Sequence, residues 1–127
     1  MWPYSFVTRA EFEKRKDFVD STLRHLGCEL LPASPQRMTM YGKGFHETWT
    51  SERPLYRFRG VYIHIGEVLH EKPFLVLELA DTLEEAKSNE MEDADPFPYD
   101  LPDDEIVLEV KRSLGLEEYP KKMSPDS

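Results

Sequence analysis

Histidine and carboxylate residues occur together in the middle of the chain, and such side chains can bind metal ions or transfer protons. They are His46, Glu47, His64 and Glu67, followed closely by His70 and Glu71. Imidazole and carboxylate groups both serve as metal ligands, but the spacing here matches no metal-binding pattern. We therefore predict no metal and no cofactor. A small-molecule or catalytic site requires His46, Glu47, His64 and Glu67 to converge at one end of a sheet.

Cys28 is the only cysteine of the chain, and His25 precedes it by three residues. A nucleophilic thiol needs a neighbouring base and an exposed, electropositive setting. Gly27 separates the two residues, and Cys28 begins the apolar run CELL. We predict a buried, inert thiol, and an intrachain disulfide is impossible with one cysteine.

The segment 90–105, EMEDADPFPYDLPDDE, contains eight carboxylates, three prolines and two aromatic residues, with no basic residue. PDDE at 102–105 is typical of a helix start, because proline suits the first turn and carboxylates stabilise the positive end of the helix dipole. Residues 90–100 remain unexplained by this helix. Two rings beside carboxylates indicate either docking onto the domain or a partner-binding surface. The candidate partner-binding residues are Glu92, Asp93, Asp95, Phe97, Tyr99 and Asp100.

The charge of the chain is unevenly distributed, although the net charge of 127 residues is −9. Residues 1–59 contain ten Lys or Arg and seven Asp or Glu, whereas residues 60–127 contain six and eighteen. The first part therefore carries +3 and the second −12. Nucleic-acid binding needs lysine and arginine to contact phosphates, so we expect a basic protein partner and no nucleic acid.

Two helices are clearly indicated at the ends of the chain. Thr8 and Glu11 have capping-box spacing, and Gly27 follows the apolar face, so we predict a helix over 9–26. Its basic residues are expected mostly in solvent; they are Lys14, Arg15, Lys16 and Arg24. A second long helix should begin after Pro102 and end at Gly115. A short helix over about 82–88 is predicted from Asp81 and Glu84, which repeat the capping spacing.

The intervening residues favour strands. GKG at 42–44 lacks the spacing of a phosphate-binding loop, so we predict a hairpin turn between strands 37–41 and 45–49, followed by a loop at SERP, 51–54. The strongest β pattern covers 55–69, where the apolar parity changes at Gly60 and indicates a bulge. His64 is expected on the more hydrated face of this strand. Residues 74–79 are apolar on both parities, which is typical of a central strand.

These elements predict an α+β fold with an N-terminal helix, a mainly antiparallel sheet of about four strands, a short helix, an acidic proline-containing loop and a C-terminal helix. We expect one domain over 1–115 and a mobile tail over 116–127. There is no run long enough to span a membrane and no apolar core of a signal peptide in MWPYSFVTRAEFEKRK. We therefore expect a cytoplasmic protein without membrane contact.

The function that best fits these features is a small acidic protein-binding module, such as an inhibitor or immunity-type protein, that engages a basic surface through residues 90–105. One alternative is a small-molecule or enzymatic domain that uses the histidine and glutamate residues of the sheet. In another, the acidic loop packs within the molecule over Arg53, Arg57 and Arg59. A nucleic-acid role would need one basic surface, formed by Lys14, Arg15, Lys16, Arg57 and Arg59.

Overall fold

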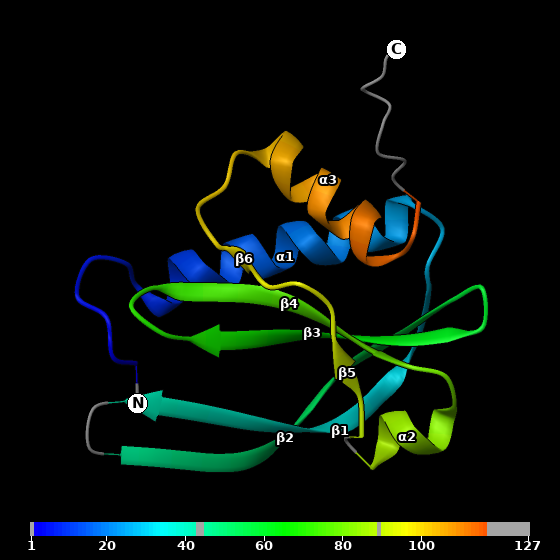
Figure 1. Ribbon diagram of the computed structural model, residues 1–127, viewed down its shortest axis with the longest axis horizontal. Coiled ribbons are helices and arrows are strands. Elements are labelled where there is room, and N and C mark those ends of the chain that lie inside the picture. The colour runs from blue at the N-terminus through cyan, green and yellow to red at the C-terminus, as the bar shows by residue number, and fades with distance from the viewer. Residues whose placement is uncertain (1, 43–44, 89, 117–127) are drawn as a thin grey trace.

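The computed structural model describes residues 2–42, 45–88 and 90–116, and the side chains of residues 34–51 lie outside this description. Along the chain lie α1 (Arg9–His25), β1 (Glu29–Gly42), β2 (Phe45–Phe58), β3 (Val61–Leu69), β4 (Pro73–Ala80), α2 (Leu83–Lys87), β5 (Glu92–Asp93), β6 (Phe97–Pro98) and α3 (Asp103–Ser113). Helices α1 and α3 lie on one side of an antiparallel sheet, as Figure 1 shows. The predicted α+β architecture is confirmed.

The sheet has six strands among the described residues, two more than predicted. Its order is β1-β2-β3-β4-β5, and β6 also pairs with β4. The additional strands, β5 and β6, have two residues each and come from the acidic segment, whose prolines had indicated an irregular loop. The tail predicted for 116–127 lies outside the described residues apart from Leu116.

Helix α1 begins as its sequence predicts. The amide of Glu11 donates to Thr8 Oγ1 at 3.0 Å, and the amide of Thr8 donates to Glu11 Oε1 at 2.8 Å. These bonds satisfy two of the amides that have no partner within the helix. After the helix, Gly27 has a φ of 101°, which glycine adopts without the steric penalty of a side chain.

The first hairpin is longer than predicted. β1 and β2 each contain 14 residues and pair from Gly42 and Phe45 back to Glu29 and Arg57, so the predicted loop at 51–54 is wrong. Proline had favoured the loop because it cannot donate a ladder hydrogen bond. Here Pro54 lies where the β1–β2 register shifts, and such an irregularity accommodates proline within a strand.

The bulge predicted at Gly60 is a chain reversal instead. Phe58 pairs with Val61, and the two residues between them, Arg59 and Gly60, have φ values of 53° and 83°. Positive φ at both central positions is the signature of a type I′ hairpin turn. The apolar parity changes because a second strand begins after the turn.

Helix α3 starts where its sequence predicts, whereas the cap of α2 is shifted by one residue. α2 is capped by Thr82, whose hydroxyl accepts the amide of Glu85 at 3.1 Å, so the cap lies one residue beyond the predicted Asp81. α3 follows Pro102 and carries acidic residues in its first turn and basic residues in its last, as predicted. Gly115 beyond α3 has a φ of 74°.

Apolar side chains are buried on both faces of the sheet. The larger cluster joins α1, α3 and the sheet; its buried members include Phe12, Leu23, Ile63, Leu77 and Ile106. A smaller cluster contains Leu55, Ala80 and Ala86, with Tyr62 packed against it. Tyr62 and Ile63 are consecutive in β3, so their side chains point to opposite faces. The large cluster therefore fixes α1 and α3, and the small one fixes α2.

Phe97 offers a direct test of how the acidic segment contributes to the fold. Its side chain is 1% exposed within the large cluster, so Phe97→Ala should lower the free energy of unfolding by about 3–5 kcal/mol. Urea unfolding followed by circular dichroism measures this loss. Leu83→Ala is the control, since Leu83 is 39% exposed, and its effect should stay within about 1 kcal/mol. Equal losses in both variants would contradict the burial of Phe97.

Candidate functional site

The acidic segment is attached to the sheet through its backbone. Asp93 pairs with Glu78, and Phe97 pairs with Leu75, so residues 92–98 extend the sheet beyond β4. Between them, the amide of Ala94 donates to the carbonyl of Leu77 at 2.9 Å. The segment is therefore part of the folded domain.

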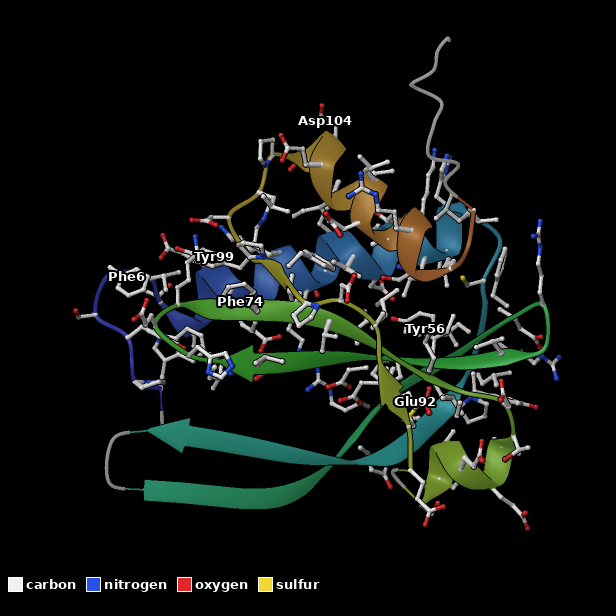
Figure 2. The ribbon with its side chains drawn as sticks, in the orientation of Figure 1. Phe6, Tyr56, Phe74, Glu92, Tyr99 and Asp104 are labelled. Atoms are coloured by element: carbon white, nitrogen blue, oxygen red, sulfur yellow. The ribbon has the colours of Figure 1, made fainter. Side chains whose placement is uncertain are left out.

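Both aromatic residues of the segment dock within the molecule. Phe97 is buried in the large cluster. Tyr99 is half-buried, and its ring lies edge-on to Phe12 with centroids 6.2 Å apart. Figure 2 shows Tyr99 beside α1. The two rings thus act as anchors for the segment.

Arg15 on α1 holds the end of the segment. Its Nε donates to the carbonyl of Tyr99 at 3.0 Å, and Nη2 donates to the carbonyl of Leu101 at 2.8 Å. Nη1 lies 3.1 Å from Oδ1 of Asp103 in an ion pair. The prediction that Arg15 lies mostly in solvent is therefore wrong, because chain carbonyls and an acid occupy its guanidinium.

Asp100 is also engaged within the molecule. Its Oδ1 lies 3.3 Å from Nζ of Lys72, which is in the connection between β3 and β4. Both side chains remain partly exposed, so this ion pair adds little stability. Arg15 and Lys72 are thus the basic residues that contact the acidic segment, whereas the intramolecular alternative had assigned that role to Arg53, Arg57 and Arg59.

Those three arginines have different contacts. Arg53 lies 3.7 Å from Glu67, and Arg57 pairs with Glu29 on β1. The guanidinium of Arg59 lies over the ring of Phe58, 4.9 Å from its centroid. Consecutive residues of this strand differ in exposure: Tyr56 is buried, whereas Arg57 is exposed.

Three carboxylates of the segment point outward. Glu92, Asp93 and Asp95 are exposed, and none forms an ion pair with another described residue. Figure 2 shows Glu92 on β5 at the front of the view. Partial loss of hydration raises the pKa of Asp93, because neighbouring chain atoms cover part of its surroundings. A cation placed beside Asp93 would relieve this cost.

The predicted histidine and glutamate site does not form around His64 and Glu67. These residues are three apart in β3, so their side chains leave opposite faces of the strand. His46 and Glu47 lie on β2, where the side chains are outside the description. His70 is exposed in the connection after β3, as a turn residue should be.

His64 is fully buried, which corrects the prediction that it faces water. Its Nδ1 lies 3.0 Å from the carbonyl oxygen of Pro54. Because a carbonyl can only accept, Nδ1 carries the proton, and Nε2 is an acceptor that lacks a hydrogen-bond partner in the described structure. Burial lowers the pKa of His64, so the ring is held neutral. The smaller apolar cluster, which covers this face of β3, could not be predicted from the alternation of apolar residues along the strand.

Glu67 lies at the centre of a buried ion cluster between β3 and α1. Its side chain is 3% exposed and lies 2.6 Å from Nζ of Lys16. Two nitrogens of Arg9 approach its two oxygens at 2.9 and 3.2 Å. Lys16 is buried, contrary to its predicted exposure. Its position four residues after Phe12 and three before Val19 places it in the apolar face, and this spacing was the available signal.

A charged cavity of about 460 Å³ adjoins this cluster. Helix α1 and the strands β2 and β3 line it with Arg9, Glu13, Lys16, Asp17, Asp20, Arg53, Pro54, Tyr56 and Ile65. Tyr56 donates its hydroxyl hydrogen to Asp20, which also accepts from Arg24 at 2.7 Å. Burial and then this hydrogen bond raise the pKa of Tyr56, so the phenol stays protonated and can donate.

The remaining features to consider in the described part of the chain are the Cys28 thiol, metal binding and membrane spans. Cys28 is buried, as predicted, and loss of hydration raises its pKa to about 11, which disfavours the reactive thiolate. Among the described residues, no group of three or more histidine, cysteine or acidic side chains is placed to hold a metal ion. None of the described helices is both long and apolar enough to cross a membrane.

Comparison of this chain with protein-family models, with curated proteins and with solved structures finds no match.

Removal of the charge on Glu67 should destabilise the fold. Glu67→Gln leaves Lys16 buried without its closest anion, so we expect a loss of about 3 kcal/mol in unfolding free energy, measured by urea denaturation. Glu29→Gln is the matched control, because the Arg57–Glu29 pair is exposed and should contribute under about 1 kcal/mol. Similar losses in both variants would show that the cluster around Glu67 is effectively hydrated.

Acidification should weaken the fold through His64. The ordinary pKa of histidine is about 6.5, and the folded value is lower, so below pH 6.5 the unfolded chain binds the proton more readily. The stability associated with a neutral His64 is complete above pH 6.5 and decreases as the pH falls below it. NMR titration of the imidazole, together with urea unfolding from pH 8 to pH 5, measures both effects. Protonation of His64 at pH 6.5 in the folded protein would contradict its burial.

Proposed function

We propose that this protein is a small acidic binding protein that engages a basic surface of a protein partner through Glu92, Asp93 and Asp95. The observation that supports this most is the orientation of residues 92–98. Their backbone pairs with β4 and Phe97 is buried, while the three carboxylates stay exposed and unpaired among the described residues. A segment held in this way loses little conformational freedom when a partner binds.

Electrostatics supports the same proposal. Residues 60–127 carry a net charge of −12, so the second part of the chain attracts cationic surfaces over a distance of about one Debye length, roughly 8–10 Å. Such attraction mainly increases association rates and specificity. More specifically, we propose an inhibitor that covers a basic active-site cleft, as immunity-type proteins do.

Asp93 adds a pH dependence to this binding. A bound cation favours its ionised form, whereas its present surroundings favour the neutral form. Affinity should therefore fall as the medium is acidified toward the pKa of Asp93, which lies above the ordinary 3.8.

A competing explanation assigns these acids a purely structural role. Charged residues on short edge strands prevent two sheets from pairing through their edges. In that case, neutral replacements would cause self-association and leave partner binding intact. The two explanations therefore differ in what the same variant does.

The test is quantitative affinity purification from the native host with wild type and a triple variant, Glu92→Gln, Asp93→Asn and Asp95→Asn. We expect a basic protein that is captured by wild type and lost by the variant, with an affinity that decreases between 50 and 200 mM salt. Size-exclusion chromatography of the variant measures its self-association.

A second triple variant controls for net charge: Glu52→Gln, Glu71→Gln and Asp81→Asn neutralise three exposed acids outside residues 92–95. This control should retain the partner. Identical capture by all three proteins, or equal loss from both variants, would overturn the proposal.

A further inference from the structure

The charged cavity between α1 and the sheet has two ends of opposite character. Arg9, Lys16 and Arg53 surround the carboxylate of Glu67 at one end, where Glu13 also lies 2.9 Å from Arg9 and 3.8 Å from Lys16. Three cations and two carboxylates leave this end with a net positive charge. Asp17 and Asp20 line the cavity further along α1. Lys16 and Asp20 are four residues apart, which is slightly more than one helical turn, or about 6 Å along the axis. The cavity therefore presents positive and negative groups at the separation found within a small molecule.

The groups that line this cavity are held in place before any ligand arrives. Lys16 is buried against Glu67, and Tyr56 is 1% exposed with its hydroxyl on Asp20. Arg24 holds the second oxygen of Asp20 at 2.7 Å. Side chains fixed by such contacts need little rearrangement to bind a ligand, which is the general basis of preorganised sites.

Stability alone does not account for this arrangement. A buried ion pair commonly contributes no more than well-packed apolar residues of similar volume, because desolvation of the charges offsets their attraction. Here the ionic groups also border a cavity of about 460 Å³, a size within the usual range of small-molecule sites. Charged groups in a partly enclosed cavity are typical of binding sites.

The distribution of charge selects the class of ligand. A simple anion would be repelled by the three acids that line the cavity, Glu13, Asp17 and Asp20, and a simple cation by Arg9, Lys16 and Arg53. A zwitterion satisfies both ends at once. Ile65 and Pro54 add apolar surface to the same wall.

We propose that this cavity binds a free α-amino acid with an apolar side chain. Its carboxylate would lie toward Arg9 and Arg53, and its ammonium group toward Asp17 and Asp20. Both groups then make charge-assisted hydrogen bonds, which are stronger than neutral ones. This site is formed by α1, β2 and β3, whereas the proposed protein-binding acids are on and next to β5, so each proposal can fail without the other.

Amide NMR spectra recorded during titration with leucine, valine and phenylalanine test the proposal. We expect saturable shifts at Lys16, Tyr56 and Ile65, with the resonances of β5 unchanged. N-acetylleucine lacks the ammonium group and isoamylamine lacks the carboxylate, so both should bind at least about tenfold more weakly than leucine. Inorganic phosphate tests for a site that takes anions in general.

Asp17→Asn provides the matching variant, because Asp17 is exposed on α1 and its replacement should not impair folding. It should weaken leucine binding about fivefold, while Glu71→Gln, outside the cavity, should leave it unchanged. The proposal is overturned if no amino acid shifts these resonances at about 10 mM, which is near the weak limit of specific binding. It is also overturned if N-acetylleucine or phosphate binds as well as leucine, or if Asp17→Asn binds leucine like wild type.

Discussion

Helix α1 is held against β3 by apolar packing and by a buried ion pair on the same face, and the rest of the structure depends on this contact. Phe12, Val19 and Leu23 are fully buried, and Lys16 lies among them against Glu67. The ion pair adds to this packing a contact that is costly to break, because removal of either partner leaves an uncompensated buried charge. With α1 held in this position, Arg15 contacts the acidic segment, and Asp17 and Asp20 line the cavity.

The acidic segment shows how a polar stretch becomes part of a fold. Its backbone completes the β4 side of the sheet, and Phe97 supplies the apolar contact that holds it there. Phe97 is buried, whereas Glu92, Asp93 and Asp95 in the same stretch are exposed. One short stretch therefore both closes the core and presents acids at the surface.

Much of the architecture could be predicted from local signals. The predicted ends of α1 and α3 are confirmed where they rest on neighbouring residues. These local signals are the capping box of Thr8 and Glu11 and the glycines that follow the two helices. The two-residue strands were missed because they exist through pairing with β4, and prolines obscure such pairing in a sequence. Gly60 was misassigned because a bulge and a tight turn change apolar parity in the same way.

The sites were less predictable for a related reason. Lys16 could have been placed in the interior by its helical spacing, but its partner Glu67 is 51 residues away in the chain, and no local rule joins them. His64 was expected near water because its strand alternates, although apolar residues from β2 and α2 cover the second face as well. Exposure depends on what folds over a strand, which the strand itself does not encode.

The hydrogen bonds from Arg15 have a consequence for how the chain is made. They join α1 to carbonyls 84 and 86 residues later, and Phe97 enters a core begun by Phe12. During synthesis, the first helix therefore emerges long before the residues that complete its environment. The domain closes only when most of the chain has left the ribosome, and until then the apolar face of α1 depends on temporary protection.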